Sequence, residues 1–151
     1  MDIDNKPCLV VGGGRIAFRK INVLRDFGAD VIVVAREICP QIRELTDITI
    51  IEKDFSADDC TDMTLVIAAT GNAETDLAIA SECKKAKIPV NVISKGSGGS
   101  FSFPAYIKQG NAVAAFSGGG GSPLIAQKLK AEAEAYMTPL KGELADLLSA
   151  L

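Results

Sequence analysis

Apolar residues in the first part of the chain form short continuous runs, and the segments between these runs carry apolar residues at helical spacing. A continuous apolar run bounded by turn residues is typical of a strand buried on both faces of a parallel sheet. Such runs predict strands at residues 7–11, 31–34, 48–51, 65–69 and 88–93. The spacing between them predicts helices at residues 15–27, 40–45 and 72–86. This alternation indicates an α/β fold of the Rossmann type, a doubly wound parallel sheet with helices on both faces.

Local signals predict the ends of two of these helices. The apolar stripe of the first helix is expected to consist of Ile16, Lys20, Val23, Leu24 and Phe27. Gly28 follows this stripe and supplies a helix stop. Asn72 is a suitable N-cap for the third helix. Glu74 and Asp76 in its first turn, and lysines at its end, complement the helix dipole.

The pattern changes after residue 93. Residues 94–100 contain three glycines and no apolar side chain, which predicts a mobile loop. Alternation at residues 101–103 predicts a half-buried strand, which we expect to pair with residues 112–116 across a turn at residues 109–111. A second glycine-rich loop follows this strand pair.

Two cap-and-proline pairs predict helices in the last part of the chain. Ser122 followed by Pro123 begins one helix, and Thr138 followed by Pro139 begins a final helix that ends at Leu151. The leucines of the final helix form an apolar stripe, which indicates that this end of the chain packs against another surface.

These elements predict three regions. Residues 1–93 form an NAD(P)-binding Rossmann domain, residues 94–121 form dimerisation strands and glycine-rich loops, and residues 122–151 form a helical region that looks like a shortened C-terminal domain. A two-stranded arm with aromatic side chains is marginally stable alone. We therefore expect the arm to be buried in a homodimer.

Composition excludes several classes of function. The 151 residues carry a net charge of −3, which argues against a nucleic-acid partner, because phosphate binding requires a basic surface. No apolar run approaches the roughly 18 residues of a membrane span. The acidic start of the chain does not resemble a secretory signal, so we expect a cytoplasmic protein.

The residues available for catalysis are restricted in the same way. The chain has no histidine, which excludes histidine-based acid–base catalysis and histidine-containing metal sites. The four cysteines contain no C-x-x-C pair, so we expect no metal site and no redox dithiol. Dispersed single cysteines suit a reducing compartment, where they act as small core residues. They are Cys8, Cys39, Cys60 and Cys83.

A G-x-G-x-x-A motif lies between the first predicted strand and the first predicted helix. In that context it predicts a dinucleotide-binding turn. Gly12 permits the tight turn, Gly14 lets the backbone approach a pyrophosphate, and Ala17 permits close packing of helix on strand. Backbone N–H groups at the helix start, around Arg15 and Ile16, are then available to bind the phosphates. The alternative is a glycine turn without a ligand.

The end of the second predicted strand lacks the carboxylate that usually binds the adenosine ribose. Ala35 occupies the expected position, and Arg36 follows it. Arg36 is a candidate to stack on adenine or to bind a 2′-phosphate, and the alternative is a solvated surface arginine. The motif does not choose between NAD and NADP.

Polar residues follow the fourth and fifth predicted strands, at the sheet edge where doubly wound folds bind ligands. Thr70 is a candidate contact for the nicotinamide ribose, and Asn72 is both a candidate contact and a helix cap. Asn91 lies inside a buried strand and requires a hydrogen-bond partner, either a neighbouring loop or a ligand.

Together these segments resemble the precorrin-2 dehydrogenase family, the dehydrogenase and, in some members, ferrochelatase module of siroheme synthesis. The resemblance covers residues 7–136. Its motifs are Gly12-Gly13-Gly14-Arg15-Ile16-Ala17-Phe18-Arg19-Lys20, Ala68-Ala69-Thr70, Asn91-Val92-Ile93-Ser94, Phe101-Ser102-Phe103-Pro104-Ala105, and the glycine-rich entry to Ser122-Pro123.

The resemblance implies NAD-dependent dehydrogenation of precorrin-2 to sirohydrochlorin, with NAD as hydride acceptor and NADP not excluded. It implies a homodimer and a tetrapyrrole substrate with many carboxylates. Residues expected to bind that substrate are Lys95, Lys108, Ser117, Gly118 and Gly119, with the following glycines. Lys95, Lys108 and the loop each have an alternative interpretation, as surface lysines or a flexible loop.

The chain departs from the family at the position of its catalytic aspartate, which is Ser94 here. Serine is a poor base near neutral pH, and the chain has no histidine to replace it. This departure argues against chelatase activity and predicts slow dehydrogenation. The alternative function is a non-catalytic, dinucleotide-binding regulatory or partner subunit.

Overall fold

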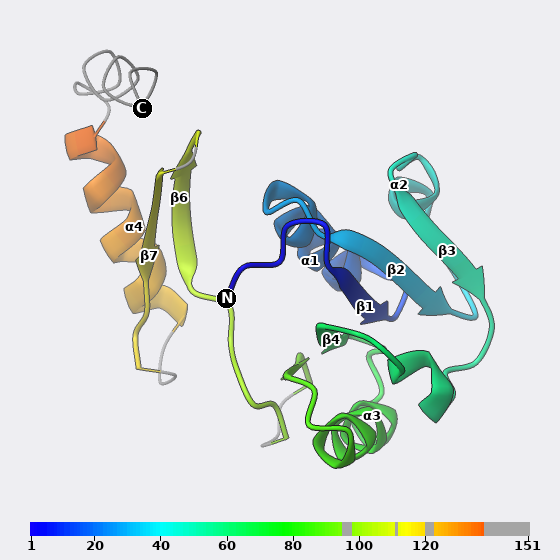
Figure 1. Ribbon diagram of the computed structural model, residues 1–151. Coiled ribbons are helices and arrows are strands. Elements are labelled where there is room, and N and C mark those ends of the chain that lie inside the picture. Colours follow the sequence, from blue (N-terminus) through cyan, green and yellow to red (C-terminus); the bar gives the residue numbers. More distant parts are fainter. Residues whose placement is uncertain (95–97, 111, 120–122, 138–151) are drawn as a thin grey trace. The chain divides into compact units, whose positions relative to one another are not determined.

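The protein is described by a computed structural model, which covers residues 1–94, 98–110, 112–119 and 123–137. The chain divides into two compact units, Met1–Phe101 and Ser102–Leu151. Each unit is described by itself (Figure 1).

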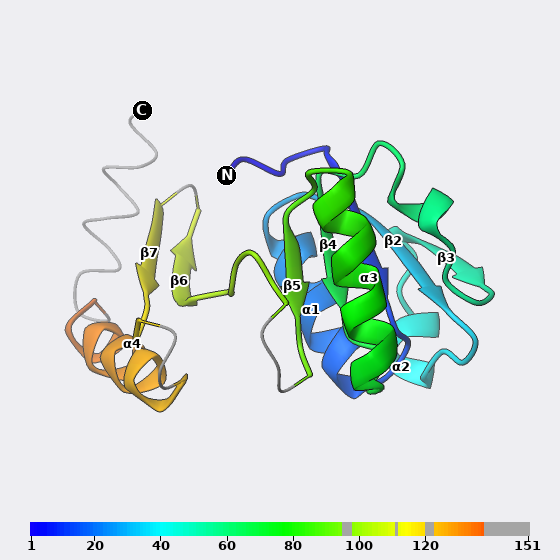
Figure 2. The ribbon, with the colours of Figure 1, turned by 90° about the horizontal axis from the view of Figure 1, so that it is seen from below.

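The first unit is a five-stranded parallel sheet with the strand order β3-β2-β1-β4-β5. Figures 1 and 2 show α1 and α3 on opposite faces of this sheet. The doubly wound α/β fold predicted from the sequence is therefore confirmed. Its elements are β1 (Pro7–Val11), α1 (Arg15–Asp26), β2 (Asp30–Ala35), α2 (Pro40–Arg43), β3 (Ile48–Glu52), a short 3₁₀ helix η1 (Ala57–Cys60), β4 (Leu65–Ala68), α3 (Ala73–Lys85) and β5 (Val90–Val92).

The core of this unit lies on both faces of the two central strands. All four residues of β4 are buried, as are the last four of β1, which explains why these strands read as continuous apolar runs. On the α3 side, Leu9, Val66 and Ile79 belong to one cluster of buried side chains. Val10 and Ile67 are likewise fully buried.

The structure corrects the predicted stripe of α1. Its buried residues are Ala17, Ile21 and Leu24, whereas the side chain of Ile16 is 51% exposed. The helix begins at Arg15, so the small Ala17 is the first position that faces the sheet, and Ile21 and Leu24 follow it at helical spacing. The predicted stripe was therefore wrong in starting at Ile16.

A further correction concerns the loop after β5, predicted as mobile over residues 94–100. Residues 95–97 lie outside the described part of the chain. Ser100 hydrogen-bonds the outer edge of β5: its N–H donates to the Val90 carbonyl at 2.8 Å, and its Oγ accepts from the Val90 N–H at 2.8 Å. This segment pairs with an otherwise open strand edge, so the first unit extends beyond residue 93 to Phe101.

The second unit contains an antiparallel hairpin of β6 (Ala105–Gln109) and β7 (Ala112–Phe116), followed by α4 (Pro123–Met137). The predicted strand at residues 101–103 is wrong, although its partner and turn position are right. Gln109 pairs with Ala112 around Gly110, which has φ of 57°, and five paired positions bring Ala105 opposite Phe116. The turn therefore sets the register, and the Phe101 carbonyl is held by Asn91 of the first unit.

Pro123 is the first residue of α4, as its cap-and-proline signal predicted. Ser122 and the predicted final helix after residue 137 lie outside the described residues. Among the helices that the structure describes, none is long and apolar enough to cross a membrane.

Candidate functional site

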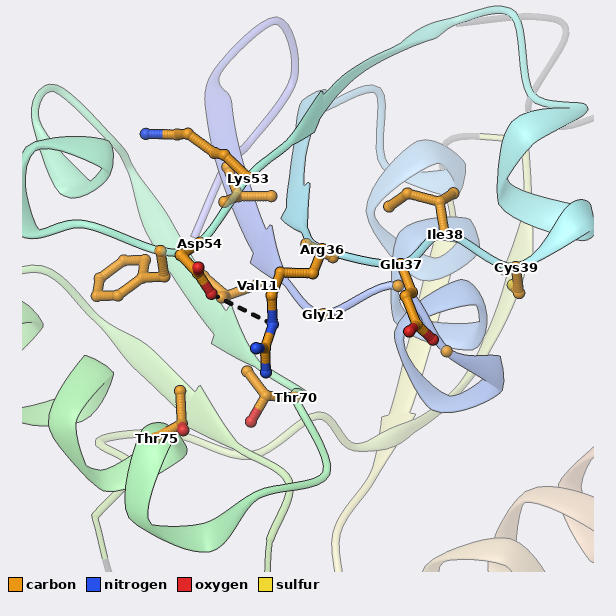
Figure 3. Close-up of a pocket in the computed structure, with 15 residues that line it drawn as sticks. Val11, Gly12, Arg36, Glu37, Ile38, Cys39, Lys53, Asp54, Thr70 and Thr75 are labelled. Carbon is orange, nitrogen blue, oxygen red and sulfur yellow. Dashed lines mark ion pairs between the residues drawn. The ribbon is translucent and has the colours of Figure 1, made fainter.

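A pocket of about 740 Å³ lies at the carboxyl ends of the sheet strands, beside the point where the strand order reverses between β1 and β4. Doubly wound folds bind ligands at this position, because neighbouring loops diverge there and leave a crevice. Figure 3 shows the side chains that line it. They are Val11, Gly12, Gly13, Gly14, Val34, Ala35, Arg36, Glu37, Ile38, Cys39, Lys53, Asp54, Phe55, Thr70 and Thr75.

The three glycines after β1 differ in how much space the structure leaves for a side chain. Gly12 has φ of 128°, and a Cβ there would overlap the Ala69 carbonyl. A Cβ at Gly13 would overlap the Glu37 carbonyl. A Cβ at Gly14 would meet no atom within 4 Å. The fold therefore requires the first two glycines, whereas the third leaves open space at the start of α1.

The start of α1 fits an anionic ligand. Gly14 is its N-cap and supplies no side-chain hydrogen bond, and the first turn contains no acidic residue. The first N–H groups of a helix need acceptors, and the helix dipole favours an anion there. A pyrophosphate requires open space, backbone N–H donors and no negative charge nearby, and this turn offers all three. Arg15 and Ile16 are exposed and contribute backbone to this turn, but they are not among the lining residues.

The end of β2 places Ala35 and Arg36 at the same pocket. Ala35 is half-buried, and the Arg36 side chain is exposed. Arg36 Nε lies 3.2 Å from Asp54 Oδ1, an ion pair drawn in Figure 3. Asp54, which follows β3, was not predicted as a pocket residue, because nothing in its local sequence shows that β3 ends beside β2.

Thr70 is held by a buried carboxylate. The Thr70 N–H and Oγ1–H both donate to Asp76 Oδ1, at 3.0 Å and 2.7 Å. Asp76 is fully buried, and its Oδ2 has no hydrogen-bond partner among the described residues. Asn72 caps α3 by accepting from the Thr75 N–H at 3.0 Å, so its predicted structural role is confirmed.

Sequence reasoning treated Asp76 only as a charge at the helix start. A threonine at the end of a strand, six residues before an acid in the next helix, was the signal that could have indicated this contact. The consequence is that the loop between β4 and α3 is fixed at the pocket by side-chain hydrogen bonds.

The predicted residues near β5 do not line the pocket. Asn91 is buried, and its Nδ2 donates to the Phe101 carbonyl at 2.9 Å, so a neighbouring loop supplies a partner. Its Oδ1 has no partner in the described structure. Ser94 is half-buried and follows β5 by two residues. Lys95 lies outside the described residues.

The predicted substrate-binding residues of the glycine-rich loop belong to the second unit. Ser117 Oγ accepts from the Gly119 N–H at 3.4 Å, and Gly119 has φ of 67°. Gly118 lies between them, and Lys108 is exposed on β6. Their role toward a substrate stays a prediction.

The buried cysteines are core residues of the first unit. Cys60 and Cys83 Sγ atoms lie 3.8 Å apart, and burial raises the pKa of the Cys83 thiol to about 12. Burial also raises the pKa of Cys8 to about 11. No group of three or more cysteine, aspartate, glutamate or histidine side chains is arranged to hold a metal ion within the described part of the chain.

Comparison with known proteins agrees with this geometry. A family model described as "Putative NAD(P)-binding" matches residues 1–105. The chain is 35% identical over 150 residues to a siroheme synthase of Vesicomyosocius okutanii, covering 97% of this chain and 32% of that protein. It is 38% identical over 148 residues to a siroheme synthase of Methylococcus capsulatus, covering 96% and 31%. The chain thus spans about a third of the length of these relatives.

A solved structure titled "SirC, precorrin-2 dehydrogenase" has the same fold. It is 29% identical in sequence, with a TM-score of 0.70, over 90% of this chain and 68% of that chain. The chain therefore belongs to the family described as putative NAD(P)-binding, and its similarity to siroheme synthases and to a precorrin-2 dehydrogenase agrees with the resemblance that its sequence motifs indicated.

Proposed function

We propose that the chain is a dehydrogenase of siroheme biosynthesis that oxidises precorrin-2 to sirohydrochlorin with a nicotinamide dinucleotide as hydride acceptor. The observation that carries this proposal is the pocket at the start of α1, in a chain that aligns over 90% of its length with a precorrin-2 dehydrogenase. The dinucleotide supplies the redox chemistry, and the protein supplies binding and orientation.

The chain's own residues have three tasks in this proposal. The first N–H groups of α1 bind the pyrophosphate, and Gly14 leaves room for it. Ala35 and Arg36 lie at the adenosine end of the pocket. The bond from Thr70 to Asp76 keeps the β4–α3 loop fixed beside the site, so that the bound group is oriented without reordering this loop.

Ser94 makes this chain a slow catalyst in the proposal. If a carboxylate at this position accepts the substrate proton, its absence costs about 10²–10⁴-fold in rate. Substituting Ser94→Asp should restore much of that rate in a precorrin-2 turnover assay that follows NADH formation. The affinity for NADH should not change, because Ser94 is not among the residues that line the dinucleotide pocket.

Ser81→Asp is the matched control, since it adds the same charge on the exposed face of α3. It should leave the rate unchanged. A wild-type chain that is already fast, and that Ser94→Asp does not improve, would contradict this role for position 94. Chelatase activity is not part of the proposal.

Ser94 also supports a second candidate, a non-catalytic dinucleotide-binding regulatory or partner subunit. In that case neither wild type nor Ser94→Asp turns over precorrin-2, although both bind NADH. The same two measurements therefore separate the two functions.

We further propose that the chain acts as a homodimer through its second unit. Four large apolar side chains of that unit are exposed, three of them on α4, and burying them in a partner would remove their area from water. They are Val113, Leu124, Ile125 and Leu129.

A further inference from the structure

The adenosine end of the pocket lacks the group that normally selects NAD. In pockets specific for NAD, a carboxylate at the end of the second strand accepts hydrogen bonds from the ribose. By its charge it also repels a 2′-phosphate. Here β2 ends at Ala35, which is half-buried and lines the pocket. A methyl group can neither bind the 2′-hydroxyl nor repel a phosphate.

The next residue brings a cation to the same place. Figure 3 shows the Arg36 side chain extending across the pocket from the β2 end toward Thr70. Its side chain is 79% exposed, so the guanidinium is held by little packing. The ion pair with Asp54 uses Nε, and the two terminal nitrogens have no hydrogen bond to any described residue. A guanidinium with two free nitrogens presents the planar fork that binds phosphate oxygens bidentately.

From this juxtaposition we propose that Arg36 is a specificity-determining residue that lets the pocket accept a 2′-phosphate, so that the chain binds NADP(H) as well as NAD(H). The inference rests on the proposed function, because it requires that a nicotinamide dinucleotide occupies this pocket.

The other charged residues at this end support a role for Arg36 rather than for its neighbour. Lys53 Nζ is bonded to Asp59 at 2.5 Å and to Ser56 at 3.4 Å, and in Figure 3 it points away from Arg36. Glu37 lies beside the glycine loop in the same view. Arg36 is therefore the basic lining residue whose donors are directed into the pocket.

Asp54 explains how one pocket serves both dinucleotides. Its carboxylate side chain is 81% exposed, and exposed ion pairs are weak, so a phosphate can replace it on Arg36 at little cost. Without a 2′-phosphate, the same carboxylate is available as an acceptor for a ribose hydroxyl. Asp54 thus restrains Arg36 in the empty pocket and competes with the phosphate.

The test is calorimetric titration of NADPH and NADH, and of 2′,5′-ADP and 5′-AMP; the members of each pair differ only by the 2′-phosphate. The full chain should bind NADPH and NADH with dissociation constants within about tenfold of each other. Arg36→Ala should weaken the binding of NADPH and 2′,5′-ADP at least tenfold, or about 1.4 kcal/mol, and change the affinity for NADH and 5′-AMP less than about threefold. Asp54→Asn should strengthen 2′,5′-ADP binding.

Arg43→Ala is the matched control. Arg43 is another exposed arginine near β3, paired with Glu52 through two bonds of 2.6 Å and 2.8 Å, and it does not line the pocket. Its loss should change the affinity for all four ligands slightly and by the same factor. Because Arg36 is exposed, its variant should keep the thermal unfolding curve of the wild type.

Three outcomes overturn the proposal. If Arg36→Ala lowers the affinity for NADH and NADPH equally, Arg36 stacks on adenine and does not bind the phosphate. A chain that binds NADH but not NADPH would show that Arg36 does not accept the phosphate. A chain that binds neither dinucleotide would overturn the proposed function itself, and this inference with it.

Discussion

The two units of the chain bury apolar residues to very different extents. In the first unit, both faces of the sheet are covered, and β1, β4, α1 and α3 all contribute fully buried side chains. In the second unit, Ile107 and Ala126 are the buried apolar residues among those described, and Val113, Leu124, Ile125 and Leu129 are exposed. The first unit therefore has a core of its own, whereas a single hairpin and helix have one thin layer.

This difference teaches where binding and assembly are expected. A ligand pocket needs walls that do not move, and the first unit provides them at the ends of strands fixed by a two-sided core. A surface with exposed apolar side chains is suited to association, because burying it in a partner removes that area from water.

The largest expected effect is on stability. Leu9→Ala should lower the free energy of unfolding by about 2–5 kcal/mol, because it leaves a cavity in a fully buried strand. Ile107→Ala, in the thinner second unit, should cost less than about 2 kcal/mol. Urea denaturation followed by circular dichroism measures both. Equal losses in one cooperative transition would contradict the idea of two unlike units.

The second-largest loss in the free energy of unfolding is expected for Asp76→Ala. It removes the acceptor of the Thr70 N–H and Oγ1–H, and leaving buried donors unsatisfied costs about 1–3 kcal/mol. Asp76→Asn keeps a carbonyl oxygen and should lose less. If the two variants unfold at the same urea concentration as wild type, the β4–α3 loop is not held by this carboxylate.

Assembly gives a smaller but directional effect. Leu124→Glu should raise the dissociation constant of the homodimer at least tenfold, about 1.4 kcal/mol, because it places a charge on the apolar surface of α4. Leu77→Glu is the control, since Leu77 is 46% exposed on α3 of the first unit. Light scattering at micromolar concentration follows the mass. A monomeric wild type, or disruption by Leu77→Glu alone, would refute the assignment of the interface to the second unit.

The last expected effect is absent at neutral pH and appears only in alkali, as a loss of stability. An unfolded cysteine titrates near pH 9, whereas burial raises the pKa of folded Cys83 to about 12. Between these values the unfolded chain releases a proton that the folded chain keeps, so stability is full below pH 9 and falls as pH rises toward 12. Cys83→Ala should reduce this slope in urea titrations at pH 8–11. An unchanged slope would show that Cys83 does not contribute to it.

Much of the first unit could be predicted from the sequence, because its strands are buried on both faces and continuous apolar runs such as residues 8–11 have few other interpretations. The glycine motif could also be located, since it lies between such a strand and an amphipathic helix. The stripe of α1 was misplaced by one residue, because periodicity alone does not show that the small Ala17 is the position facing the sheet.

What the sequence did not predict depends on contacts distant in the chain. The hairpin register follows from the turn at Gly110, while the alternation at Phe101 and Phe103 suggested a different strand. The hydrogen bond between Thr70 and Asp76 depends on the loop after β4 packing against α3. The ion pair between Arg36 and Asp54 depends on β3 lying beside β2. Local patterns carry no information on such juxtapositions.

The central claim is that a nicotinamide dinucleotide binds at the open start of α1, and titration of NADH into wild type and Gly14→Val tests it most directly. A Cβ at Gly14 would meet no protein atom within 4 Å, so the variant should fold, yet valine there should fill the space that the pyrophosphate needs. The account predicts saturable binding to wild type, and affinity at least tenfold lower for Gly14→Val, about 1.4 kcal/mol, with an unchanged circular dichroism spectrum. Equal affinity of the two folded proteins, or no binding to wild type, would contradict it.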